Sequence, residues 1–129
     1  MSEPPQRIRS DSPYEPVLGF VRAVRSGSRV LVSGTAPVWP DGSCDPDPYE
    51  QARRCIAIIA DALRAAGADL GDVVRTRMFL VDVRDADAVG RAHAEAFAAS
   101  PPAATMVVVA ALLDPRWRVE IEAEAVIND

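Results

Sequence analysis

The sequence predicts an α+β domain in which two helices cover one face of a mixed β-sheet. In the final run, residues 119–126, apolar residues alternate with three glutamates. A period of two is typical of a strand with two different faces. Two other stretches, residues 52–66 and 89–97, repeat their apolar residues at every third or fourth position, as amphipathic helices do. Each such helix buries its apolar side on the sheet, which gives the predicted order β-β-α-β-α-β-β.

The N-terminal part is predicted to be an irregular lead-in followed by a hairpin. The whole chain, 1–129, has the length of a single domain, and residues 1–16 are polar and rich in proline. The runs 20–24 and 29–35 are typical of strands, and the turn Ser26-Gly27-Ser28 joins them.

The first helix has clear signals at both ends. Asp47 is placed to cap it, with Pro48 in the first turn and Glu50 in the register of a capping box. Gly67 is placed for the C-terminal cap. The buried side is predicted to hold Ala52, Cys55, Ile56, Ile59, Leu63 and Ala66.

The second half is predicted to hold one more helix between strands. Residues 74–81 form a strand rich in β-branched residues, and Asp85 can cap the helix that carries Val89 to Phe97. The nearly all-apolar run 105–113 is predicted to be a strand buried on both faces. Two one-sided helices leave the other sheet face uncovered. Because that face carries apolar positions, we expect a closed homo-oligomer.

Composition excludes several classes of function. The net charge of -5 argues against a partner that is a nucleic acid. All 14 basic residues are arginine, so no lysine can form a Schiff base. Cys44 and Cys55 belong to no cluster, so we expect no metal ion and no cofactor. No apolar leader or membrane span is visible, which predicts a cytoplasmic protein.

Several polar and aromatic residues allow two interpretations. Alternation places Arg75 and Arg77 on one strand face, where they either form structural ion pairs with the glutamates or bind a substrate. The single histidine, His93, is either a packed residue beside the apolar stripe or a general base. Trp39 and Trp117 either rim a cleft or cover an edge of the core.

In five places the chain resembles the RidA family, also called YjgF or UK114-like. The matching segments are Gly19–Val24, Val32-Ser33-Gly34-Thr35, residues 66–74, Pro102-Ala103-Ala104-Thr105 and the final strand. The likeness spans about residues 19–127. It implies a chorismate-mutase-like fold that forms a homotrimer, with small-molecule clefts between subunits.

The resemblance also implies a chemistry. In active members of the family an arginine clamps the carboxylate of a 2-imino acid, and a glutamate matching Glu120 directs water onto the imine carbon. Residues matching Phe20 and Ser33 line the cleft, and Gly34 and Thr105 lie in the same motifs. Glu120 is otherwise one member of a solvated or ion-paired row.

This chain departs from that pattern at several positions. The clamp position holds Ala104, Phe20 lacks a phenol, Gly90 replaces a frequent asparagine and Met106 a frequent cysteine. An anionic substrate in a partly desolvated cleft needs a paired cation. Simple 2-imino acids are therefore expected to be poor substrates unless Arg77 replaces the clamp.

Three functions remain open on the sequence alone. The first is hydrolysis of an enamine or imine, or a related addition of water, with Glu120 handling the water. Phe20, Ser33, Gly34, Thr105 and Arg77 would then bind the substrate. The second is a non-catalytic trimer that binds a small ligand. The third is an endoribonuclease or translation inhibitor, for which no acid–base pair is visible.

Overall fold

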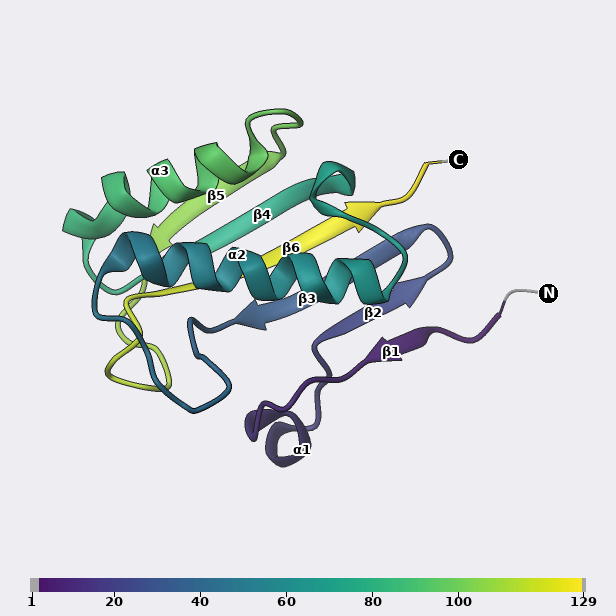
Figure 1. Ribbon diagram of the computed structural model, residues 1–129, viewed down its shortest axis with the longest axis horizontal. Helices are drawn as coiled ribbons and strands as arrows, with labels where there is room; N and C mark the ends of the chain where they lie inside the picture. The colour runs from purple at the N-terminus through teal and green to yellow at the C-terminus, as the bar shows by residue number, and fades with distance from the viewer. Residues whose placement is uncertain (1–2, 129) are drawn as a thin grey trace.

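The computed structural model describes residues 3–128, which form a six-stranded sheet with helices against it (Figure 1). The elements in chain order are β1 Gln6–Ile8, α1 Tyr14–Leu18, β2 Ala23–Ser26, β3 Arg29–Thr35, α2 Pro48–Ala65, η1 Leu70–Asp72, β4 Val73–Leu80, η2 Val83–Asp85, α3 Ala86–Phe97, β5 Ala103–Val108 and β6 Val119–Val126. The strand order is β1-β2-β3-β6-β4-β5, and β4 and β5 run parallel while the other neighbours are antiparallel. The predicted α+β class with a mixed sheet is confirmed.

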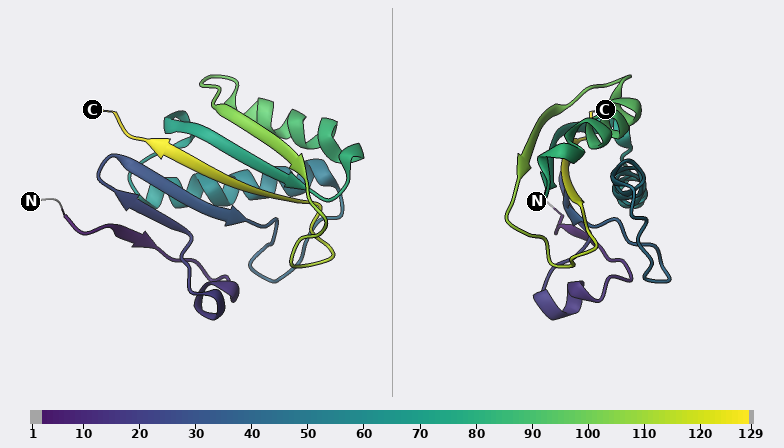
Figure 2. Two further views of the ribbon diagram at one scale, coloured as in Figure 1. Left: turned by 180° about the vertical axis from the view of Figure 1, so that it is seen from behind. Right: turned by 90° about the vertical axis from the view of Figure 1, so that its left-hand side faces the viewer.

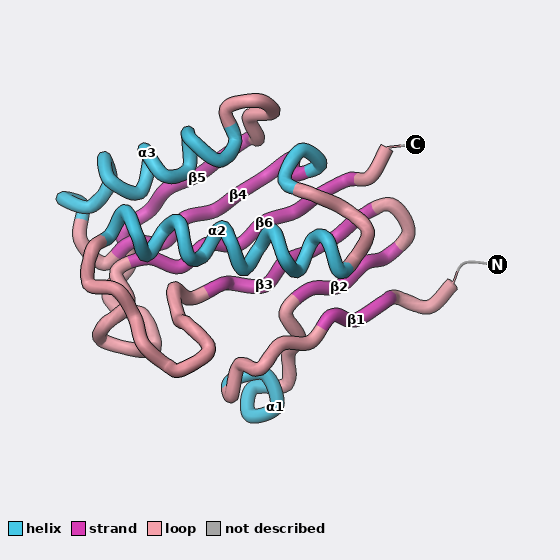
Figure 3. The backbone as a smooth tube through the Cα atoms, viewed as in Figure 1, coloured by secondary structure: helices cyan, strands magenta, loops and turns pink. Residues whose placement is uncertain are grey.

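Both long helices lie on the same side of the sheet. The end-on view in Figure 2 shows α2 and α3 on one face and the opposite face without a helix. Figure 3 shows that the loops between α2 and its neighbouring strands gather at the ends of the sheet. No helix within residues 3–128 is long and apolar enough to cross a membrane. The sheet therefore has one covered face and one open face.

Both predicted caps of α2 form, but the capping box predicted with Glu50 does not, because the backbone N–H of Asp47 donates to the Asp45 carboxylate at 2.8 Å. The Asp47 carboxylate accepts a hydrogen bond from the backbone N–H of Glu50 at 3.3 Å. At the other end Gly67 has a φ of 88°, which suits glycine, and the N–H of Ala68 donates to the carbonyl of Leu63 at 2.8 Å. These caps fix the length of the helix and therefore the position of its apolar stripe on the sheet.

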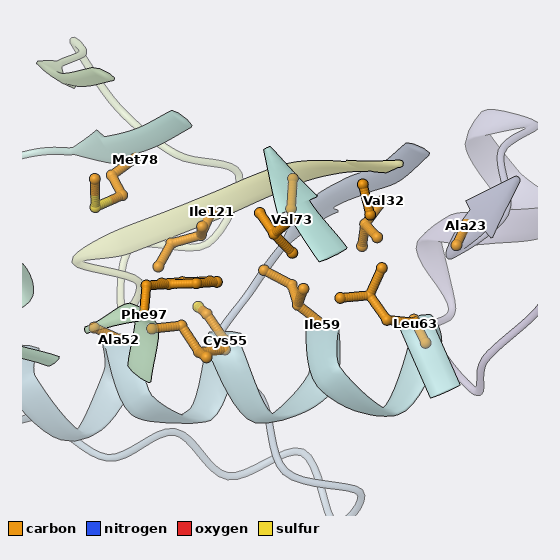
Figure 4. Packing of buried hydrophobic residues seen from close by; sticks show 14 of the residues in the cluster. Ala23, Val32, Ala52, Cys55, Ile59, Leu63, Val73, Met78, Phe97 and Ile121 are labelled. Atoms are coloured by element: carbon orange, nitrogen blue, oxygen red, sulfur yellow. The ribbon is translucent and has the colours of Figure 1, made fainter. Parts of the chain in front are cut away.

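The core lies between α2, α3 and the covered sheet face. Cys55, Ile59 and Leu63 of α2 point toward the strands, each fully buried (Figure 4). Opposite them lie the apolar residues of β6, none more than 3% exposed: Val119, Ile121, Ala123 and Ala125. The alternation predicted for the last strand is confirmed, because Glu120, Glu122 and Glu124 point to the open face and are half-buried.

The lead-in, predicted to be irregular, contains two short elements. β1 pairs with β2, Ile8 opposite Ala23, and α1 begins at Tyr14. The prediction was wrong because β1 exists only through tertiary pairing, which no alternation in the chain announces. The strand predicted at residues 20–24 begins only at Ala23, and the hairpin to β3 is confirmed.

The strand predicted over residues 105–113 is shorter in the structure, and it is not buried on both faces within one chain. β5 covers Ala103–Val108, and five of its six residues are exposed within the chain. The reason is topological, because β6 inserts between β3 and β4 and leaves β5 at the edge of the sheet. Its apolar residues, such as Val107 at 42% exposure, have no cover from the described part of this chain.

Asp85 occupies the position before α3, but its side chain makes no cap. The carboxylate instead accepts two hydrogen bonds from the Arg118 guanidinium, at 2.9 and 3.0 Å. A bidentate arginine–carboxylate pair is stronger than a neutral hydrogen bond to a backbone N–H. Asp85 therefore ties the start of α3 to the chain just before β6.

Candidate functional site

The open face of the sheet brings acidic and basic residues of three strands together. In the antiparallel register of β4 and β6, Arg77 lies opposite Glu122 and Phe79 lies opposite Glu120. The Arg77 guanidinium is 3.1 Å from a Glu122 oxygen and 3.5 Å from a Glu124 oxygen. Arg29 of β3 reaches Glu124 from the other side at 3.4 Å. Two of the three glutamates are thus ion-paired, as the structural interpretation predicts for Arg77. Arg75 lies opposite Glu124 in the register but forms no ion pair within residues 3–128.

Glu120 lies in a different environment from the other two glutamates. No ion pair joins it to any residue of 3–128, and burial raises the pKa of its carboxyl above the ordinary value. The charge of Arg22 opposes this rise and the charge of Glu122 adds to it. A carboxylate with a raised pKa, on a face open to ligands, is suited to exchange protons with water.

Gly34 makes room for this carboxylate. A Cβ atom on Gly34 would lie 2.2 Å from Oε2 of Glu120, far inside van der Waals contact. Any other residue at this position would displace the carboxylate. The structure thus shows that the group closest to a Cβ position at Gly34 is the Glu120 side chain.

Arg22 is a residue of this site that sequence reasoning missed. Its side chain is 7% exposed, and Nη2 donates a hydrogen bond of 2.6 Å to the carbonyl of Gly34. Its guanidinium carbon lies 5.6 Å from the centre of the Phe20 ring. Burial lowers the pKa of Arg22, while the charges of Glu15 and Glu120 raise it. The only signal in the sequence was its place inside a family motif.

The predicted site residues fall into two groups within one chain. Phe20, Ser33, Gly34 and Glu120 lie around Arg22 at one end of β3 and β6. Phe20 and Ser33 also line a pocket of about 490 Å³, of which Glu120 is not part. The Ser33 hydroxyl donates to the carbonyl of Val21 at 2.7 Å, so its proton is already engaged.

Arg77 and Thr105 form the second group, opposite one another in the register of β4 and β5. Ala104 pairs with Thr76, which is fully buried, so Ala104 faces the helix side of the sheet and not the glutamates. A side chain at position 104 therefore does not meet Glu120 of its own chain. Thr105 itself is exposed on the open face.

His93 lies on the covered side of the sheet, away from the glutamates. Its Nε2 is 2.8 Å from the hydroxyl of buried Thr76, and its ring stacks against Phe97 at 4.6 Å between centroids. Burial lowers the pKa of His93, which keeps the ring neutral near pH 7. This environment matches the packed interpretation of the histidine. Within residues 3–128, no cluster of three or more His, Cys, Asp or Glu side chains is arranged to hold a metal ion.

The fold and the site define a class of protein: a small α+β domain whose open sheet face carries a partly buried glutamate beside a glycine. The endoribonuclease L-PSP family model matches residues 10–127. The chain therefore belongs to this family, which is also called RidA, YjgF or UK114-like.

Known relatives are similar over nearly their full lengths. The uncharacterized protein SCO2049 of Streptomyces coelicolor is 42% identical, spanning 96% of this chain and 93% of that protein. The 2-iminobutanoate/2-iminopropanoate deaminase of Salmonella typhimurium is 37% identical over 83% of this chain and 86% of the enzyme. The crystal structure of Rv2704 from Mycobacterium tuberculosis, a YjgF/YER057c/UK114 family member, has a TM-score of 0.89 at 40% identity, covering 96% of this chain and all of that one.

Proposed function

We propose that this protein hydrolyses imines or enamines that carry no carboxylate next to the reacting carbon. The observation that carries the proposal is Glu120, unpaired among three glutamates, partly buried and placed against Gly34. The name of the deaminase from Salmonella supports the reaction class. Ala104 and the occupied Arg77 support the absence of a carboxylate, because neither offers a free cation.

In the proposed reaction Glu120 acts as a general base. Its carboxylate takes a proton from water while the water oxygen bonds to the imine carbon, and the C=N π electrons move to nitrogen, which is protonated. Glu120 gives the proton it took from water to this nitrogen. It then carries the hydroxyl proton of the resulting carbinolamine to the same nitrogen, so the C–N bond breaks and ammonia leaves. One imine and one water thus give one carbonyl compound and one ammonia, with no cofactor required.

The proposed active form is a homotrimer with the site between subunits. Two observations support assembly: the open face exposes Leu31 and Val107 at 44% and 42%, and β5 leaves an edge unpaired in the described chain. Light scattering should give three times the 13.8 kDa of one chain, and a stable monomer would contradict the assembly.

Two flavin oxidases provide a matched pair of substrates for the activity. A flavin amine oxidase releases imines without a carboxylate, and an amino-acid oxidase releases 2-imino acids. The protein should speed ammonia release from the first class and leave the second near the background rate. Equal acceleration of both classes would contradict the substrate assignment. Acceleration of neither would favour the alternative, a trimer that binds a small ligand without turnover, which the missing clamp at Ala104 also fits.

A further inference from the structure

A second pocket, of about 590 Å³, shares only Arg22 with the candidate site. It is bounded by one side of α2, by the N-terminal segment 8–14 and by the loops 36–42 and 114–117. Figure 1 shows these segments converging below α2, on the helix side of the sheet. Glu120, Gly34, Phe20 and Ser33 are not part of its wall. Its volume falls in the range of sites that enclose small molecules.

Two buried donors without partners belong to the wall of this pocket. Nε1 of Trp117 and Nε of Arg22 have no hydrogen-bond acceptor within residues 3–128. Trp117 is 5% exposed and Arg22 7% exposed. Buried donors are nearly always paired, because an unpaired one loses its hydration without compensation. Both donors belong to residues that line the pocket, which favours a ligand that brings acceptor oxygens to this side of it.

The charge of the pocket favours an anion, although the chain as a whole is acidic. Arg54 stacks on Trp39, with the guanidinium carbon 4.1 Å from the ring, and its Nε donates to the carbonyl of Val38 at 3.1 Å. Within the described residues Arg54 has no ion-pair partner. Of the three acidic residues that line the pocket, Asp114 pairs with Arg116 and Asp61 with Arg64, whereas Asp11 forms no ion pair within residues 3–128. Four arginines line the pocket against these three carboxylates: Arg9, Arg22, Arg54 and Arg116. The lining thus keeps a small positive excess, and Arg54 is free to pair with a ligand.

The pocket also presents flat apolar surface. Trp39 is 47% exposed, and Tyr14 meets Trp117 edge to face with 5.8 Å between ring centroids. Aromatic walls of this kind bind planar rings by offset or edge contacts. Combined with an unpaired guanidinium, they suit a ligand with an apolar ring and an anionic group.

We propose that this pocket is a binding site for a small aromatic carboxylate, separate from the Glu120 site. The carboxylate pairs with the Arg54 guanidinium, and the ring packs on the tryptophans. A further oxygen of the natural ligand accepts a hydrogen bond from Trp117 or Arg22. The site requires no residue of a second subunit and no turnover at Glu120.

Tryptophan fluorescence can test this proposal directly. The chain has two tryptophans, and both line this pocket, so their emission reports on it alone. We use 3-phenylpropanoate as the probe and 3-phenylpropanol as its uncharged match. The carboxylate should change the emission saturably, and the alcohol should bind at least about tenfold more weakly, as expected when a charged hydrogen bond is lost.

Two arginines next to each other on α2 give matched variants. Arg54→Gln should weaken 3-phenylpropanoate binding by about tenfold or more, whereas Arg53→Gln, which makes the same change of charge outside the pocket, should stay within about twofold. Trp117→Phe, measured by calorimetry, should weaken binding while keeping the ring contact. Glu120→Gln should leave binding unchanged, so this proposal stands or fails apart from the proposed hydrolysis.

Three outcomes would overturn the pocket assignment. One is the absence of a saturable signal with 3-phenylpropanoate up to about 10 mM. A dissociation constant above that concentration would be too weak for a specific small-molecule site. Another is equal binding of the alcohol and the carboxylate. The third is equal weakening by Arg53→Gln and Arg54→Gln, which would indicate general attraction of the anion to α2.

Discussion

The two ends of β6 carry the same residue type on the same face, and they differ in what surrounds it. At one end Glu122 and Glu124 form ion pairs with Arg77 and Arg29, at N–O distances of 3.1–3.5 Å. At the other end Glu120 meets Gly34 and has no ion pair within the described chain. The first arrangement neutralises charge and holds strands together. The second leaves a carboxylate with a raised pKa and no fixed partner, which is the condition for acid–base work.

The largest expected effect comes from removing the charge of Glu120. Glu120→Gln keeps the shape but cannot accept a proton, so imine hydrolysis should fall by about 10²-fold or more. Glu122→Gln is the control and should change the rate by less than about threefold, because the Glu122 carboxylate forms an ion pair with Arg77. Both variants should keep the assembly seen by light scattering. An equal loss of rate in the two variants would contradict the assignment of Glu120 as the general base.

The next effect comes from moving the carboxylate without changing it. In Gly34→Ala the new Cβ would fall 2.2 Å from Oε2, so Glu120 must rotate away. Because Oε2 is the tip of a flexible side chain, stability should change little. Activity should nevertheless drop by about tenfold or more, since a displacement of about 1 Å can cost that much. Retained activity with an unchanged melting temperature would contradict the position assigned to Glu120.

A smaller effect concerns the pH dependence of the reaction. The base form of Glu120 is lost as the pH falls through its raised pKa, so activity should decline on the acid side. Arg22 opposes the rise, and Glu122 adds to it. Arg22→Gln should therefore move the acid limb to higher pH, and Glu122→Gln should move it to lower pH. Rate profiles that shift in the same direction for both variants would contradict Glu120 as the titrating group.

The contrast also shows what a sequence can and cannot specify. Alternation alone gave the face of every residue in β6, and the caps of α2 were readable from Asp47 and Gly67. The difference between Glu120 and Glu122 was not readable from the pattern, because it depends on which strands flank β6 and in which register. β6 lies between β3 and β4, which are distant in the chain, so Gly34 reaches Glu120 and Arg77 reaches Glu122 only after folding.

The same tertiary effect explains the residues that were misjudged. The run 105–113 is apolar enough to be buried, yet strand order puts β5 at the edge. Asp85 has the sequence of a cap, yet Arg118 competes successfully for its carboxylate. Arg22 looked like one polar residue in a strand, and its role beside Gly34 and Phe20 arises from packing. In each case a long-range contact decided between local possibilities.

The smallest expected effect concerns stability. Here the ion-paired end of β6 should be more sensitive to substitution than the end that carries Glu120. Arg77→Gln removes two partly exposed ion pairs and should lower the free energy of unfolding by about 0.2–1 kcal/mol, the usual range for such pairs. The loss should shrink in 1 M NaCl, where the Debye length is only about 3 Å.

Glu120→Gln should not lower the free energy of unfolding at neutral pH. A carboxyl whose pKa is higher in the folded state than in the unfolded chain loses stability as the pH rises through that pKa, so removing it should leave the protein equally stable or slightly more stable. Urea unfolding of both variants at pH 7 measures the difference, and a loss of stability in Glu120→Gln as large as that in Arg77→Gln would place Glu120 among the ion-paired residues.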